Sequence, residues 1–282
     1  NGNCQRSGKV PVSGGLRDLL AIALPMVVSH FCDTMMTFTD RIFLSRLGPE
    51  QMNAAMSGGL TSFMLMTFFM GLIGYTTALV AQHLGAGQKD RCALATTQAL
   101  LICLAAYPMI LLARPFVLHA FEISGISANQ LVHQKVYFGI LIYAVIIGLL
   151  RTCLSSFFSG IGKTRMVMVS AFVAMGTNIG LNYILIFGKM GMPAMGIRGA
   201  AYGTILGGLT GLVILAAAYL RPSIRQEYHI ARSFRFDRKM MGKLLRFGYP
   251  AGLEMFLNLL AFTGMIMAFH THGPVSATAA TI

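Results

Sequence analysis

One carboxylate, Asp40, lies near the end of an apolar stretch (19–44) that is long enough to cross a bilayer. A carboxylate at the centre of a spanning helix costs about 2.5–3.5 kcal/mol on insertion scales, and such residues usually mark ion or proton pathways. The chain has only nine acidic residues, and two others, Asp33 and Glu254, also fall inside apolar stretches. We therefore expect Asp40 to hold a cation or a proton inside the membrane.

Asp40 belongs to a row of polar side chains on the same predicted helix. His30, Asp33, Thr37 and Asp40 follow one another at steps of three and four residues. On an α-helix these positions fall within one arc of about 80°. Lipid cannot satisfy such a row, so it should face the interior of a helix bundle or a water-filled cavity. Either the row lines a functional cavity, or it is a structural seam that hydrogen-bonds to neighbouring helices.

Two later apolar stretches carry further oxygen ligands. Asn178 and Asn182 are one turn apart and therefore share a helix face. Their carboxamide oxygens could ligate a hard cation beside a carboxylate, or the two amides could form interhelical hydrogen bonds. Thr204 could add a hydroxyl to such a site. It lies beside four glycines spaced four residues apart, which we interpret as a surface for close helix approach: Gly199, Gly203, Gly207 and Gly211.

The composition indicates a polytopic membrane protein. Hydrophobic residues make up 55% of the 282 residues and charged residues 11%, against about 25% charged in soluble domains. The net charge of +13 does not indicate nucleic-acid binding, because the bases lie at the ends of the apolar stretches. A spanning helix needs about 20 apolar residues. Seven stretches qualify and predict an all-α fold: 19–44, 53–83, 93–113, 135–158, 166–187, 199–220 and 245–269.

Lys and Arg residues predict the orientation and the division of the chain. They gather at the N-terminal segment and in the linker after the sixth span, so the positive-inside rule places both on the cytoplasmic side of the inner (plasma) membrane. We interpret the linker as a solvated, lipid-facing basic connector. The predicted units are a cytoplasmic segment (1–18), a six-helix lobe (19–220), the basic linker (221–244), and the first helix of a second lobe with the start of the next helix (245–282).

The second lobe begins as a copy of the first. An offset of 225 residues relates Pro25 to Pro250, and also relates three pairs of short motifs: Leu19-Leu20 with Leu244-Leu245, Gly48-Pro49 with Gly273-Pro274, and Ala54-Ala55 with Ala279-Ala280. Six spans separate equivalent points, which makes this a parallel repeat of the kind found in secondary transporters, with about 12 spans when complete. We expect this chain to be a fragment that lacks its natural start. Each proline removes a helix hydrogen bond, so the two sites are predicted hinges or static bends.

The sequence shows few residues that would form an enzymatic active site or a metal site. The five cysteines show no Cys-x-x-Cys pairing, and His270-x-His272 is better explained as a wet interfacial segment. Gly162-Lys163-Thr164 is similar to the end of a phosphate-binding loop, but Phe157 stands where that motif needs a glycine. No nucleophilic triad or catalytic carboxylate pair stands out. We expect no enzyme, no cofactor, and no metal other than Na⁺ at Asp40.

Several short motifs, in their order and spacing, resemble multidrug and toxic compound extrusion (MATE) transporters, especially bacterial NorM-type members. The resemblance runs from about Leu19 to the C-terminus. It rests on Leu24-Pro25, Thr39-Asp40, Leu47-Gly48, Ala81-Gln82 with Gly85-Ala86-Gly87, Gly160-x-Gly162-Lys163-Thr164, Asn178-x-x-x-Asn182-Tyr183-Ile184-Leu185-Ile186-Phe187-Gly188, and Gly196-Ile197-x-Gly199-Ala200-Ala201.

The resemblance implies two six-helix lobes that form a V around a central cavity. It also implies a monomeric antiporter that exports organic cations in exchange for Na⁺ or H⁺ by alternating access. The family's first-helix aspartate falls on Asp40, its fifth-span polar pair on Asn178 and Asn182, and its sixth-span threonine on Thr204. In some members an aspartate takes the place of Asn182. This chain therefore lacks one protonatable group, which weakens the case for a purely proton-linked mechanism.

The resemblance further implies a coupling residue in the seventh span, where several NorM-type members have a glutamate eight residues after the proline. Asn258 occupies that position here, and Glu254 lies one turn earlier as a candidate for the same role. Thr37 and Asp33 are candidate cavity residues from the first span.

Two alternative functions remain from the sequence. The first is a lipid-linked oligosaccharide flippase of the same superfamily, although Arg41 and Arg151 are the only bases inside the spans and such proteins often carry many. The second is a non-transporting membrane module, against which the repeat and the membrane-embedded carboxylate of Asp40 argue.

Overall fold

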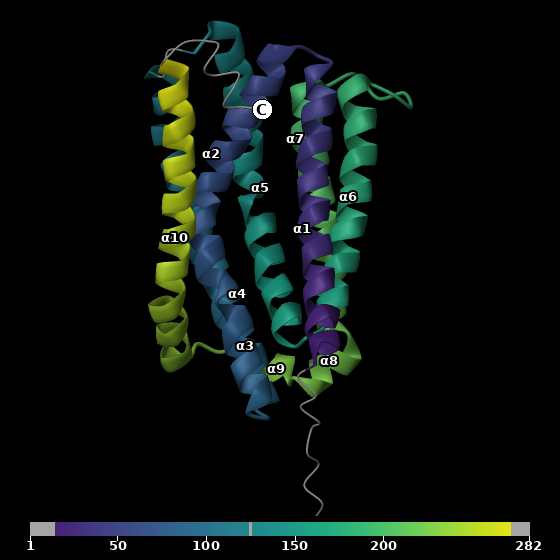
Figure 1. Cartoon of the computed structure of the whole chain (residues 1–282), viewed down its shortest axis with the longest axis vertical. Helices are drawn as coiled ribbons and strands as arrows, with labels where there is room; N and C mark the ends of the chain where they lie inside the picture. Colours follow the sequence, from purple (N-terminus) through teal and green to yellow (C-terminus); the bar gives the residue numbers. More distant parts are fainter. Residues whose placement is uncertain (1–14, 124–125, 272–282) are drawn as a thin grey trace, which may run out of the picture.

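The computed structural model describes residues 15–123 and 126–271, without the side chains of residues 17, 18 and 264–271. All regular secondary structure in these ranges is helical (Figure 1). The helices are α1 (Leu16–Ser45), α2 (Pro49–Gly74), α3 (Thr76–Gly85), α4 (Lys89–Ile123), α5 (Ala128–Gly160), α6 (Thr164–Phe187), α7 (Ile197–Leu220), α8 (Pro222–Glu227), α9 (Ile230–Ser233) and α10 (Arg238–Thr271).

Six described segments are long and apolar enough to cross a membrane: Leu19–Ser45, Pro49–Gly85, Lys89–Ile123, Ala128–Gly160, Thr164–Phe187 and Ile197–Leu220. The predicted all-α, multi-span fold is confirmed. The third span was predicted too short, at 93–113, because α4 continues past the apolar run on both sides. The second span is α2 and α3 together, interrupted at Tyr75. The predicted seventh span, 245–269, lies within the single helix α10.

The long helices stand side by side in a bundle (Figure 1). α1 packs mainly on α6, and α6 packs on α7, which also contacts α5. On the other side of α5 lie α2 and α4, and α10 covers α2. Many large apolar side chains remain exposed on the outside of this bundle, for example Phe31 on α1 and Phe172 on α6. Such an outer surface suits lipid rather than water.

Local sequence signals explain where several helices begin and end. Pro49 occupies the first turn of α2, where its missing N–H costs nothing. Ser127 caps α5 by accepting a hydrogen bond from the backbone N–H of Gln130 at 3.4 Å. Gly188 ends α6 in the left-handed conformation, with φ of 66°. α1 continues through Pro25 and α10 through Pro250 as helix, so their hinge roles stay predictions.

The four spaced glycines of α7 form a surface of close helix contact, as their spacing predicts. A Cβ at Gly199 would lie 2.7 Å from the backbone carbonyl of Leu185, and one at Gly207 would lie 2.8 Å from Cβ of Asn178. These distances are too short for any side chain, so the glycines let the backbones of α6 and α7 approach closely. The close contact places the asparagine face of α6 directly against α7.

Candidate functional site

Asp40 lies on the face of α1 that packs against α6 and α7. One carboxylate oxygen accepts a hydrogen bond from the side-chain amide of Asn182 on α6. The other lies 3.2 Å from the hydroxyl of Thr204 on α7. Three residues from three helices, separated by up to 164 positions in the sequence, therefore meet at one point.

The two asparagines are fully buried, each with 0% of its surface exposed. The amide oxygen of Asn182 has no hydrogen-bond partner, and neither amide atom of Asn178 has one, among the described residues. A buried polar atom without a hydrogen-bond partner lowers stability by about 1–3 kcal/mol, so such atoms are rare in native proteins. The two asparagines thus carry amide oxygens of the kind that a hard cation requires, although it is the N–H of Asn182 that now faces the carboxylate.

The hydroxyl of Thr204 is shared between two acceptors. It lies 2.9 Å from the backbone carbonyl of Ala200 and 3.2 Å from the Asp40 carboxylate. A hydroxyl has one proton to donate. When that proton goes to Ala200, the hydroxyl oxygen and the carboxylate face each other as two acceptors. A cation or an added proton between them would remove the repulsion.

Tyr137 on α5 completes the surroundings of the site and was missed by the sequence analysis. Its side chain is buried, and its phenol lies against Thr204 and within electrostatic range of Asp40. A buried tyrosine hydroxyl usually needs a hydrogen-bond partner. A tyrosine inside the predicted span 135–158 was therefore the available signal, but nothing in its spacing assigned it to Asp40.

The polar row on α1 serves two different contacts. Asp33, the second residue of the row, forms an ion pair with Arg151 of α5 at 2.8 Å, with 46% and 22% of their side chains exposed. Thr37 donates to the backbone carbonyl of Asp33 at 3.1 Å, and the side chain of His30 is exposed. The row therefore divides: Asp33 makes an ion pair, Asp40 makes the contacts with α6 and α7, and His30 and Thr37 are exposed.

Glu254 and Asn258 lie apart from this arrangement. Both are exposed on α10, which packs mainly on α2, and within the described residues no hydrogen bond joins either to Asp40. Their coupling role stays a prediction. In the same described part of the chain no group of three His, Cys, Asp or Glu residues could hold a metal ion. The oxygen donors that do converge are those around Asp40.

Comparison with known proteins gives one family. The family model MatE matches residues 25–184. A "Probable multidrug resistance protein NorM" from Mesorhizobium japonicum is 31% identical over 86% of this chain and 52% of its own length. One of the same name from Bacillus subtilis is 27% identical over 91% of this chain and 58% of its own length. The chain therefore spans little more than half the length of these relatives.

Solved structures show the same fold. A MATE crystal structure in complex with MaD5 matches with a TM-score of 0.80 and 21% identity, over 94% of this chain and 60% of that one. An outward-facing multidrug resistance MATE family transporter of the MOP superfamily matches with a TM-score of 0.77 and 22% identity, over 90% and 54% of the two chains. At these identities the likeness extends to the fold alone.

Proposed function

Because the chain belongs to the MatE family, a family of multidrug and toxic compound extrusion (MATE) transporters, we propose that it carries the coupling-ion site of an antiporter. The antiporter exports organic cations from the cell in exchange for Na⁺ or H⁺. One observation carries this proposal: Asp40 meets Asn182 and Thr204, and within the described ranges the amide oxygens of Asn178 and Asn182 have no hydrogen-bond partner. The protein works as a monomer in the inner membrane, with its N-terminus in the cytoplasm.

The donor set around Asp40 fits either coupling ion, Na⁺ or H⁺. The carboxylate of Asp40, the hydroxyl of Thr204 and the amide oxygens of Asn178 and Asn182 are all hard oxygen ligands. The amide of Asn182 now donates its N–H to Asp40, so rotation of this amide would be needed before its oxygen could serve. A proton on Asp40 is the simpler occupant, since it needs no such rotation.

The position of Asp40 suggests how ion binding drives transport. α1 is held to α6 and α7 through this carboxylate, so the charge state of the site changes how the three helices pack. A coupling ion shifts the equilibrium between two packings only by its difference in affinity for them. We propose that the ion-bound packing has lower affinity for the organic cation, which is then released outside.

Of the two bases inside the spans, Arg41 is exposed on α1 and Arg151 is paired, which argues against an anionic substrate that needs several unpaired bases. Arg151 is neutralised by Asp33, so it does not present a free positive charge to the substrate. A lipid-linked oligosaccharide, the substrate of the flippase alternative, carries phosphates and would need unpaired bases along its path.

The proposal is tested by measuring how the coupling ion and the substrate bind to the purified chain. Na⁺ is titrated at fixed pH, and ethidium is added in weak buffer with a pH indicator to detect proton release. For Na⁺ coupling, Asp40→Asn should weaken Na⁺ binding at least about tenfold, equivalent to ~1.4 kcal/mol. For H⁺ coupling, ethidium should release protons from the native chain and none from Asp40→Asn. Glu50→Gln, an exposed carboxylate on α2, is the control and should behave as the native chain.

The two titrations together decide whether Asp40 holds the coupling ion. Loss of either response in Asp40→Asn alone supports the site and identifies the coupling ion. The same Na⁺ affinity and the same proton release in native chain and Asp40→Asn would show that Asp40 does not hold the coupling ion. In cells, the matching result would be undiminished Na⁺- or pH-dependent ethidium efflux at equal expression.

A further inference from the structure

The segment between α7 and α10 is folded tightly onto the bundle rather than extended. Gln98, fully buried on α4, donates to the carbonyl of Arg235 at 2.8 Å and accepts from the backbone N–H of Asp237 at 3.2 Å. Ser233 and Thr97 share a buried hydroxyl contact at 3.1 Å. These polar anchors fix the backbone of α9 and of the turn that follows it. The basic side chains of this segment therefore project from a rigid base.

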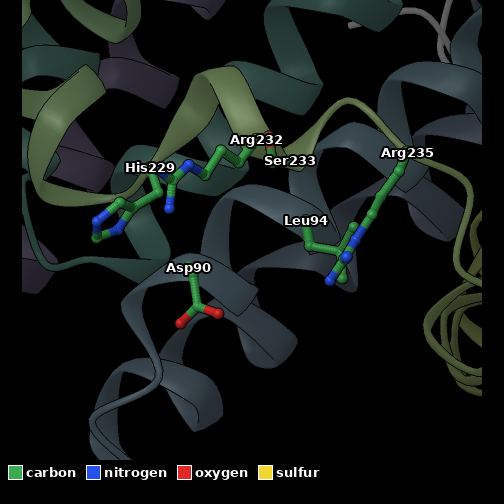
Figure 2. Close-up of a pocket in the computed structure, with 6 residues that line it drawn as sticks. All are labelled: Asp90, Leu94, His229, Arg232, Ser233 and Arg235. Carbon is green, nitrogen blue, oxygen red and sulfur yellow. The ribbon is translucent and has the colours of Figure 1, made fainter.

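A pocket of about 340 Å³ opens between this segment and the start of α4 (Figure 2). Its polar walls are His229, Arg232 and Arg235 on one side and Asp90 on the other. Figure 2 shows the Arg235 side chain extending down toward Leu94, while Arg232 extends toward His229. The pocket is thus bordered by two separate guanidinium groups, Arg232 from α9 and Arg235 from the turn that follows it.

The arginines of this pocket have no anionic partner. No ion pair within 4.0 Å is recorded for Arg232 or Arg235 in the described part of the chain, although Asp90 lines the same pocket. The one carboxylate of α8, Glu227, lies 2.8 Å from Lys89 and 4.0 Å from Lys163, so it does not pair with the arginines of the pocket. An uncompensated pair of guanidinium groups in a rigid pocket is suited to bind a phosphoryl group, whose oxygens accept bidentate hydrogen bonds.

Two exposed aromatic side chains indicate where that phosphoryl group comes from. Phe234 and Phe236 flank Arg235 and expose 63% and 65% of their surface. The segment lies at the end of the bundle from which α1 and α10 both begin (Figure 1). Exposed phenylalanines next to basic residues at the end of membrane helices are typical of surfaces that enter the headgroup layer. The lipid surface therefore lies within reach of the pocket.

We propose that the pocket formed by His229, Arg232 and Arg235 binds the phosphate of an anionic phospholipid headgroup. Arg232 and His229 hold the phosphate oxygens from one end of the pocket, and the long side chain of Arg235 turns in from the other end to complete the site. Phe234 and Phe236 enter the acyl-chain boundary beside the bound lipid. Asp90 opposes the anion and limits the affinity. Because α4 and α10 are both tied to this turn, a bound lipid would fasten the α7–α10 connection to the bundle.

The test is lipid binding to the full chain in neutral detergent, measured by native mass spectrometry. Dioleoyl phosphatidylglycerol is the anionic probe, phosphatidylcholine the zwitterionic one, and inorganic phosphate the soluble competitor. Each arginine near an anionic headgroup contributes about fivefold in affinity, so Arg232→Gln with Arg235→Gln should weaken phosphatidylglycerol binding by more than about tenfold. The control is Arg221→Gln with Arg238→Gln, which removes the same charge from exposed positions outside the pocket. Asp90→Asn should tighten binding.

The results separate the sources of the phosphate. Selective loss of phosphatidylglycerol in the pocket variant, with little competition by phosphate, supports the lipid site. Tight binding of inorganic phosphate with the same dependence on Arg232 and Arg235 would replace the lipid by a soluble ligand and overturn the proposal. Equal losses in the pocket and control variants would show only general charge attraction. Equal binding of phosphatidylcholine, or unchanged binding in Asp90→Asn, would also contradict the pocket.

Discussion

The amide of Asn182 fills the space in front of Gly203. A Cβ at position 203 would lie 1.8 Å from the amide oxygen of Asn182, well inside van der Waals contact. The same amide donates its N–H to Asp40. The absence of a side chain at residue 203 of α7 therefore allows α6 to present its amide to α1. The glycine stripe, whose spacing predicts close helix packing, therefore also sets the contact between Asn182 and Asp40 at the proposed ion site.

Gly203→Ala should disturb the ion site while leaving the bundle folded. The new methyl group must displace the Asn182 amide, which breaks its hydrogen bond to Asp40 and overpacks the contact at a cost of about 1–3 kcal/mol. We expect weaker Na⁺ binding or a loss of ethidium-induced proton release, together with a lower Tm. Gly208→Ala is the matched control on the same helix, because its Cβ would meet Ile147 at an ordinary 3.7 Å. That control should be neutral or stabilising by about 0.5–1 kcal/mol, and a similar loss in both variants would contradict this role of Gly203.

Breaking the ion pair between Asp33 and Arg151 should destabilise the contact of α1 with α5. Asp33→Asn leaves the guanidinium of Arg151 without its carboxylate inside a membrane span. Both side chains are partly exposed, so the cost should be about 1 kcal/mol rather than the larger value of a buried pair. Thermal unfolding of the single variants and of Asp33→Asn with Arg151→Met measures the coupling. Strictly additive losses in the double variant would show that the pair contributes nothing.

Gly252 should be essential for the contact of α10 with α2. A Cβ at this position would lie 2.3 Å from the backbone carbonyl of Phe68. Gly252→Ala should therefore separate the two helices and lower stability by about 1–3 kcal/mol. Gly242→Ala, on the same helix with nothing within 4 Å of its Cβ, should be neutral or slightly stabilising. Cysteine cross-linking between α2 and α10 reports the separation, and equal yields in the two variants would refute it.

The ion pair of Glu227 should give the chain a small stability change at acid pH. The hydrogen bond from Lys89 lowers the pKa of Glu227 below its ordinary value of 4.5, aided by the charges of Lys89 and Lys163. A lowered folded-state pKa adds stability above the unfolded pKa, and this stability is lost as the pH falls through the folded pKa. The pair is largely exposed, so the gain should stay below about 1 kcal/mol. The Tm of the native chain should exceed that of Glu227→Gln at pH 7 and converge with it near pH 3; a constant difference would disprove the linkage.

The sequence alone determined the class of this protein, a multi-span helical protein, and singled out Asp40 as the residue to explain. Apolar stretches of spanning length follow directly from composition, because each must bury its backbone in helices to enter lipid. Asp40 stood out because a carboxylate in such a stretch is costly. The period of a helix also put Asn178 and Asn182 on one face and aligned the glycines of α7.

Only the tertiary structure decided which faces meet. Helical period assigns residues to a face of their own helix, but it does not give the rotation or the depth at which two helices pack. The contacts of Asp40 with Asn182 and Thr204, the ion pair of Asp33 with Arg151, and the place of Tyr137 all depend on that packing. The basic linker shows the same division. Its positive charge was evident in the sequence, but its position against α4 was not. The buried amide of Gln98 forms its hydrogen bonds with the backbone of this linker, because buried polar groups need partners, and these bonds hold the linker against α4.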